Sequence, residues 1–211
     1  MSRRGKLHEG LTSFLGETAL ERIRGATVGI AGAGGLGSNC AMLLARSGFV
    51  NLVIADFDRV EKTNLNRQFF FAHQIGMAKT DALEMNILAI EPSITIAKHQ
   101  LRVTKENAAT LFSHCDAVVE AFDNPQSKAM LAEEIARLGI FLVCASGIAG
   151  HGSCDSIRVK RISDSFYIVG DSERAVCPED PPLAPRVTIA AAKQADLVLH
   201  YILTRRDISR T

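Results

Sequence analysis

The feature that most constrains the fold is the run from Ala31 to Ser38, AGAGGLGS, because half of its residues are glycine. It follows a short apolar and β-branched run at 26–31, which is typical of a buried parallel strand. Residues 38–47 after it are apolar on nearly every side, as expected for a helix enclosed between a sheet and other helices. A strand, a glycine turn and a helix in this order bring backbone N–H groups and a positive helix end to one point that a phosphate can approach closely.

An acidic residue directly follows the next predicted strand, and its position also indicates a nucleotide site. Asp56 follows the apolar run at 51–55, at the distance where a carboxylate can accept hydrogen bonds from a ribose. The two strands and the helix between them predict a right-handed βαβ unit. Together these features predict a nucleotide-binding site, and they leave the identity of the nucleotide open.

The rest of the chain alternates short apolar runs with helical patterns, which predicts an α/β, Rossmann-like fold with a mostly parallel sheet and helices on both faces. Strands are expected at 94–97, 116–121 and 140–145, and helices at 79–90, 105–112 and 124–138. Beyond Gly150, alternation at 155–161 and a second short run at 166–169 predict antiparallel strands that extend the sheet. Four prolines predict that 177–185 is a stiff, irregular crossing loop before a final helix at 187–203.

The domain organisation expected from this pattern is a single domain over 1–211. It has a helical lead-in at 1–25, a nucleotide-binding core at 26–150, and an antiparallel extension with crossing loop and final helix at 151–211. The lead-in carries apolar residues that we expect to pack on the main domain or on a second copy of the chain. These are Leu11, Phe14, Leu15, Leu20 and Ile23.

Composition narrows the functional class. The formal net charge is +1, so bulk electrostatics favour neither nucleic acid nor an anionic membrane as partner. No signal peptide and no apolar run of membrane-spanning length is recognised. The five cysteines are scattered and never form a Cys-x-x-Cys pair, which favours reduced thiols and argues against a structural zinc site. We therefore expect a soluble, cytoplasmic protein without zinc.

Seven polar residues are expected at the carboxyl ends of the strands, where open α/β sheets bind ligands. Arg67 and Lys79 can offset charge as a phosphoanhydride bond breaks, and Asp123 can hold Mg²⁺. Lys79 falls at a helix start, where the macrodipole opposes a cation, so its position requires a local anion. Asp123 or Asn124 would also make an ordinary helix cap. The seven residues are Asp56, Asp58, Asn64, Arg67, Gln68, Lys79 and Asp123.

A nicotinamide or flavin oxidoreductase remains a distant alternative, since the glycine turn alone is compatible with NAD or FAD. Such an enzyme would not need two cations and a metal-binding acid at this edge. It would need a His or Tyr acid beside a hydride acceptor, and none of the six histidines falls at these positions. The polar set therefore favours a nucleoside triphosphate.

Five segments carry a resemblance to a known family. They are GAGGLG at 32–37, DFDRVE at 56–61, TNLNRQ at 63–68, GMAK at 76–79 and FDN at 122–124. In this order they resemble the ThiF/MoeB adenylyltransferases, the prokaryotic branch of the ubiquitin-activating-enzyme superfamily. The PPLAPR segment at 181–186 and the final helix resemble a short ThiF-type branch. The asparagine–arginine run at 63–68 is much more specific than the glycine motif.

The resemblance implies that Mg-ATP adenylates the C-terminal Gly-Gly carboxylate of a small ubiquitin-like sulfur carrier, most simply a ThiS-like carrier of thiamine thiazole synthesis. It also implies a homodimer. Arg67, Lys79 and Asp123 are the implied catalytic residues, with Asp123 positioning Mg²⁺. The implied nucleotide-binding residues are Gly32, Gly34, Gly35, Asp56, Asp58, Asn64, Arg67, Gln68, Lys79, Asp123 and Asn124.

Several points stay open at this stage. The carrier is alternatively of molybdopterin type, the substrate alternatively a modified tRNA, and a relative that binds the carrier without turnover shares the same motifs. The Cys-x-x-Cys pairs of longer relatives are absent, and their N-terminal arginine motif is not recognised, so any role of Arg3 or Arg4 is open. Cys177 lies on the crossing loop, where some relatives carry an acyl- or sulfur-accepting thiol. Its acidic neighbours disfavour a thiolate, with Arg174 as the one local counterweight, so a cysteine without covalent function is the preferred interpretation.

Overall fold

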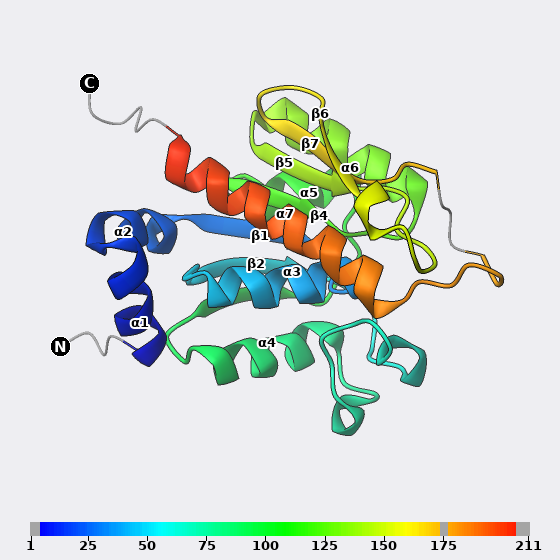
Figure 1. Cartoon of the computed structure of the whole chain (residues 1–211), viewed down its shortest axis with the longest axis horizontal. Coiled ribbons are helices and arrows are strands. Elements are labelled where there is room, and N and C mark those ends of the chain that lie inside the picture. The colour runs from blue at the N-terminus through cyan, green and yellow to red at the C-terminus, as the bar shows by residue number, and fades with distance from the viewer. Residues whose placement is uncertain (1–4, 174–176, 206–211) are drawn as a thin grey trace.

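The computed structural model describes residues 5–173 and 177–205, which form one seven-stranded sheet with helices on both faces (Figure 1). The strand order is β3-β2-β1-β4-β5-β7-β6, and every neighbouring pair is parallel except β6–β7. The chain moves outward in one direction through β2 and β3 and in the other through β4 and β5. The order therefore reverses beside β1. The strands are β1 Thr27–Ala31, β2 Asn51–Ala55, β3 Thr95–His99, β4 Ala117–Glu120, β5 Phe141–Ala145, β6 Arg158–Arg161 and β7 Phe166–Gly170.

Two apolar cores form because successive side chains of a strand point to opposite faces. In β4, Val119 packs into the core shared with α3, α4 and α7, whereas Val118 packs into the core shared with α5 and α6. Figure 1 shows α3, α4 and α7 on the near face of the sheet. The expected parallel sheet with helices on both faces is confirmed. The helices are α1 Lys6–Leu15, α2 Glu17–Gly25, α3 Gly35–Arg46, α4 Lys79–Ile90, α5 Lys105–Phe112, α6 Pro125–Leu138 and α7 Ala184–Thr204.

The C-terminal part of the sheet is antiparallel only at its outermost pair. The chain leaves β5, forms the edge strand β6, and turns back into β7, which pairs with β5 in parallel and with β6 in antiparallel register. The expected antiparallel extension is thus confirmed for β6 and β7 relative to each other. The crossing loop is also shorter than expected, because α7 begins at Ala184 with Pro185 in its first turn. Proline is well tolerated there, since the first N–H groups of a helix have no intrahelical acceptor.

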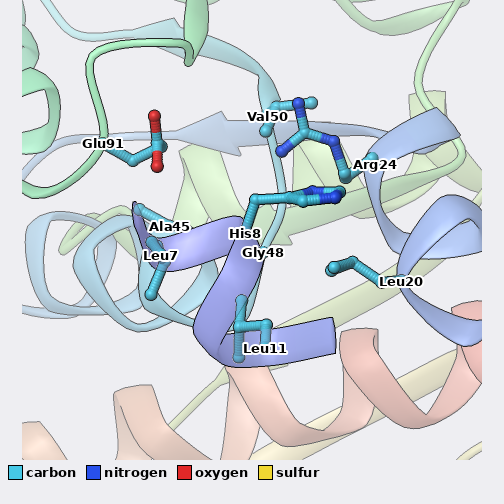
Figure 2. Close-up of a pocket in the computed structure, with 9 residues that line it drawn as sticks. All are labelled: Leu7, His8, Leu11, Leu20, Arg24, Ala45, Gly48, Val50 and Glu91. Atoms are coloured by element: carbon cyan, nitrogen blue, oxygen red, sulfur yellow. The ribbon is translucent and has the colours of Figure 1, made fainter. Parts of the chain in front are cut away.

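The described part of the lead-in is helical, as expected, and it forms two helices, of which α2 anchors it. Leu20 and Ile23 are fully buried, whereas Phe14 at the end of α1 is 86% exposed. A small pocket lies where α1, α2 and the main body meet (Figure 2). His8 extends into it toward Leu20 and Arg24, and among the described residues neither of its ring nitrogens has a hydrogen-bond partner.

Two further points concern the chain as a whole. Within residues 5–173 and 177–205, no helix is both long and apolar enough to cross a membrane. Arg3, Arg4 and Arg174, which the sequence raised as possible contributors, lie outside the described residues.

Candidate functional site

The glycine turn connects β1 to α3, and glycine is found at its positions for two different structural reasons. Gly32 has φ +98°, a conformation that disfavours other residues, and a Cβ there would lie 2.8 Å from the carbonyl oxygen of Ala121. A Cβ on Gly37 would lie only 1.8 Å from the carbonyl oxygen of Gly32. Around Gly34, by contrast, the nearest atom is Gln68 Nε2 at 3.9 Å. Gly32 and Gly37 are therefore required by the turn itself, while Gly34 leaves open space beside it.

A cleft of about 980 Å³ opens at the carboxyl edge of the sheet, directly over this turn. It lies beside β1 and β4, where the strand order reverses, which is the place where open α/β sheets bind ligands. The cleft wall contains every nucleotide-binding residue expected from the sequence except Asn64. Those in the wall are Gly32, Gly34, Gly35, Asp56, Asp58, Arg67, Gln68, Lys79, Asp123 and Asn124.

Asn64 lies behind the wall, so the direct phosphate contact expected of it does not follow from its position. It ends the short 3₁₀ turn Lys62–Asn64, and its Oδ1 accepts the N–H of Glu61 at 3.0 Å. Its carbonyl oxygen accepts the N–H groups of Arg67 and Gln68. Asn64 thus shapes the turn that brings Arg67 and Gln68 to the cleft.

Asp56 ties the end of β2 to the glycine turn. Its Oδ2 accepts the N–H of Ala33 at 2.6 Å, and its Oδ1 accepts the N–H of Asp58 at 2.7 Å. The side chain is largely buried yet borders the cleft. Each carboxylate oxygen can accept a second hydrogen bond, so the ribose contact expected of Asp56 remains chemically available.

Lys79 and Asp58 form a partly buried ion pair in the cleft wall. The Lys79 Nζ lies 2.7 Å from Asp58 Oδ2, and the lysine side chain is 7% exposed. The Lys79 N–H also donates to the carbonyl oxygen of Asp58. Asp58 is thus the local anion that a lysine in the first turn of α4 requires. The pair has no net charge, and it fixes the Lys79 ammonium in the cleft wall.

Arg67, Gln68 and Asp123 supply the other polar groups near the turn. Arg67 donates to the carbonyl oxygen of Thr63 at 2.9 Å, and its aliphatic stem lies beside Gly35. Partial burial lowers the pKa of Arg67, and the Asp123 carboxylate opposes that shift. Gln68 Oε1 is buried without a partner among the described residues, which leaves an acceptor for a ligand donor.

Of the three aspartates in the cleft wall, Asp56 already accepts two backbone N–H groups and Asp58 pairs with Lys79, so Asp123 is the one best placed to bind a metal ion. Among the described residues no cluster of three or more His, Cys, Asp and Glu side chains is suited to a metal. Asp123 is exposed in the cleft wall. Mg²⁺ is commonly held by one or two carboxylates together with substrate phosphates, so a Mg-triphosphate fits this arrangement without further protein ligands.

The sequence does not predict the pair of Glu120 and Lys128, in which Glu120 is buried and Lys128 lies in the cleft wall. Lys128 Nζ lies 3.1 and 3.0 Å from the two oxygens of Glu120, and 2.9 Å from the carbonyl oxygen of Ala145. Glu120 is fully buried, and burial raises its pKa while the Lys128 ammonium opposes the shift. A carboxylate as the last residue of an apolar strand was the available signal.

Asn124 and Cys177 lie on segments next to the cleft. Asn124 caps α6, with its Oδ1 accepting the N–H of Ser127 at 3.0 Å, so the helix-cap interpretation is confirmed. Cys177 is exposed and lies outside the cleft wall. Its position gives no support to a thiol acting on a group bound in the cleft.

Known protein sequences include a matching family and several similar proteins. The sequence matches the ThiF family over residues 8–211. The adenylyltransferase and sulfurtransferase UBA4 of Candida glabrata is 28% identical over 201 residues, which cover 92% of this chain and 46% of that protein. The ubiquitin-like modifier-activating enzyme 5 of Oryza sativa subsp. japonica is 33% identical over 132 residues, covering 56% and 31%. This chain therefore spans less than half the length of these curated relatives.

Solved structures include similar proteins of nearly the same length. Escherichia coli tRNA N6-threonylcarbamoyladenosine dehydratase, TcdA, is 27% identical with a TM-score of 0.83, and the match covers 94% of each chain. Its complexes with ATP and with AMP match with TM-scores of 0.79 and 0.81. E. coli MccB, solved with MccA and AMPCPP, has a TM-score of 0.69 at 21% identity, which shows a shared fold.

Proposed function

The chain belongs to the ThiF family, and from that membership we propose that it is an ATP-dependent adenylyltransferase acting on a carrier-protein C-terminus. The proposed substrate is the C-terminal Gly-Gly carboxylate of a small ubiquitin-like sulfur carrier. The observation that carries the proposal is the convergence of Arg67, Lys79 and Asp123 on one cleft above the glycine turn. A glycine turn, two cations and one carboxylate form the set that a magnesium triphosphate needs.

The reaction that fits this arrangement is attack of the carrier carboxylate on the α-phosphorus of ATP. A new acyl–oxygen–phosphorus bond forms, the bond from the α-phosphorus to the bridging oxygen breaks, and pyrophosphate leaves with that electron pair. The backbone N–H groups at the start of α3 hold the phosphates, and Asp56 binds the ribose. Arg67 and Lys79 offset the charge that develops on the leaving group. Mg²⁺ bound at Asp123 would add further charge stabilisation.

The nature of the carrier rests on the family resemblance. UBA4 and ubiquitin-like modifier-activating enzyme 5 carry names that refer to sulfur transfer and to a ubiquitin-like modifier. We propose a ThiS-like carrier of thiamine thiazole synthesis, with a molybdopterin-type carrier as the alternative. A homodimer in the cytoplasm completes the proposal. All five cysteines are free thiols, which supports a reducing compartment.

One observation favours a second candidate substrate. TcdA and this chain cover 94% of each other, whereas the match with C. glabrata UBA4 covers 46% of that protein. A modified adenosine in tRNA is therefore the second candidate. The net charge of +1 gives it no electrostatic support.

ATP–pyrophosphate exchange tests the proposal. The purified chain with Mg²⁺ and a carrier ending in Gly-Gly should show carrier-dependent exchange. Asp123→Ala should lower the rate by about 100-fold with an unchanged melting temperature, because metal and phosphate charge are no longer positioned. Glu133→Ala is the matched control, since this acid lies on α6, the helix that begins just after Asp123, and is 69% exposed.

The outcomes separate the candidates. Exchange that depends on the Gly-Gly carrier supports adenylation of a carrier, and exchange that depends only on tRNA bearing threonylcarbamoyladenosine replaces it with the second candidate. Pyrophosphate exchange at the wild-type rate in Asp123→Ala would show that Asp123 does not bind the metal ion. A chain that binds the carrier and ATP without exchange would be a binding protein.

A further inference from the structure

The segment PPLAPR at 181–186 ends in an arginine that the reaction above does not use. Arg186 is the third residue of α7, and it is completely buried. The helix macrodipole opposes a cation at a helix N-terminus, and a buried guanidinium requires several acceptors. Asp171, 5% exposed after the end of β7, supplies the counter-charge through Arg186 Nη2.

The guanidinium joins α7 to two separate loops. Its Nη1 donates to the carbonyl oxygens of Gly152 and Ser153, both at 3.0 Å, and lies 3.3 Å from Ser156 Oγ. These residues belong to the loop between β5 and β6. Asp171, on Nη2, belongs to the loop after β7. The planar fork of an arginine can satisfy both sets of acceptors at once, which a lysine cannot.

These two loops form one end of the cleft. Ser146, Gly147 and Ile148 from the first loop, and Ser172 and Glu173 from the second, all lie in its wall. The loops are hydrogen-bonded to each other, because the Asp171 N–H donates to the Gly147 carbonyl at 3.1 Å and the Ser172 N–H donates to the Ser146 carbonyl at 3.2 Å. Arg186 is not itself in the wall. It reaches the wall through Asp171.

This end of the cleft differs in chemistry from the end over the glycine turn. Arg67 and Lys79 gather near the turn, whereas the two loops at the other end contribute no cation to the wall: they supply Ser146, Gly147 with φ +72°, Ile148, Ser172 and Glu173. A Cβ on Gly147 would lie 2.1 Å from Asp171 Oδ1, so it is the missing side chain at Gly147 that lets the Asp171 carboxylate lie against the first loop. A surface of this kind suits an extended peptide end that lacks side chains, because backbone groups can pair with it directly.

We propose that Arg186 is a positioning residue that holds the Ser146–Ile148 and Ser172–Glu173 wall in place for the Gly-Gly end of the carrier. This inference rests on the proposed function for its substrate. It adds that loss of Arg186 weakens use of the carrier and leaves ATP binding intact, because the glycine turn, Arg67 and Lys79 lie in other segments of the chain.

The test compares the full chain with its Arg186→Gln and Arg186→Lys variants in three measurements. Amide hydrogen exchange is measured without substrate, ATP affinity by calorimetry, and KM for the carrier by pyrophosphate exchange. In Arg186→Gln we expect amides at 146–153 and 171–173 to exchange at least tenfold faster while those at 32–37 are unchanged. The Kd for ATP should stay within twofold, and KM for the carrier should rise at least tenfold. Arg186→Lys keeps a positive charge beside Asp171, so its exchange rates and its KM for the carrier should lie between those of the wild type and those of Arg186→Gln.

Each result decides the inference. Amide hydrogen exchange at 146–153 and 171–173 that is unchanged in Arg186→Gln would overturn the inference. A KM for the carrier equal to that of the wild type would also overturn it, as would an equal loss of affinity for ATP and for the carrier. If Arg186→Gln does not fold, Arg186→Lys and Asp171→Asn carry the same comparison. If the wild type shows no carrier-dependent activity, the proposed function fails, and the hydrogen-exchange result alone then decides whether Arg186 holds the wall.

Discussion

Gly34 and Gly37 lie three residues apart, and at the scale of single residues they have opposite steric surroundings. In a helix interior, alanine normally stabilises by about 1 kcal/mol relative to glycine. At Gly37 that gain is outweighed, because the new Cβ would lie 1.8 Å from the carbonyl oxygen of Gly32, a backbone atom that cannot move alone. The contact between α3 and the preceding turn therefore requires glycine at this position.

We expect Gly37→Ala to lower the free energy of unfolding by about 2 kcal/mol or more, measured by urea denaturation. Gly34→Ala is the matched control, because its Cβ would point into open space. This control should keep its stability within about 0.5 kcal/mol while binding ATP more weakly. A Gly37→Ala chain as stable as the wild type would show that α3 can move away from the turn.

At the scale of secondary-structure elements, the Glu120–Lys128 pair connects β4, α6 and the end of β5 beneath the cleft. Glu120 Oε1 also accepts the N–H of Phe122 at 2.7 Å, so one buried carboxylate orients the backbone that leads to Asp123. Because burial raises the pKa of Glu120, the protonated carboxyl is favoured in the folded chain relative to the unfolded chain.

The pH dependence of stability follows from the direction of this shift. A carboxyl with a raised pKa contributes stability fully below its unfolded pKa of about 4.3, and that contribution is lost as pH rises through the folded pKa. The difference in unfolding free energy between the wild type and Glu120→Gln should therefore decrease as pH is raised from about 4 to about 8. Denaturant titrations at several pH values measure it. Glu133→Gln, on the exposed face of α6, should show no such trend, and a difference that grows with pH would mean that Lys128 outweighs burial.

At the scale of the whole molecule, exposed apolar side chains bear on the proposed homodimer. Phe14 on α1 is 86% exposed, an unusual degree for a phenylalanine on a helix. We expect light scattering at micromolar concentration to give twice the chain mass of 22.8 kDa, and Phe14→Glu to shift the equilibrium toward the monomer. Val159→Glu, on the edge strand β6, is the control that should leave the dimer intact. A wild-type monomer that retains exchange activity would contradict the dimer.

Much of this molecule was readable from local sequence. Strands and helices were predicted from hydrophobic periodicity, and the glycine turn from residues adjacent in the chain. The cleft was predictable for a geometric reason, because the carboxyl ends of parallel strands meet at one edge of the sheet. The glycine turn, Asp56 and Asp123 follow β1, β2 and β4 and still arrive at the same cleft. Their chemical roles stay predictions until the exchange experiments are done.

Only the three-dimensional structure decided which polar side chains reach the cleft and which distant residues pair. Asn64 is not in the cleft wall, and its side chain closes a local turn with Glu61. Lys128 reaches Glu120 only because α6 packs back over the ends of β4 and β5, and Arg186 meets Asp171 only because α7 begins where two loops converge. Neither acid nor base in these pairs belongs to a periodic pattern. What brings each pair together is the burial of apolar faces elsewhere in the chain, and each buried charge is then offset by the opposite charge that the fold places beside it.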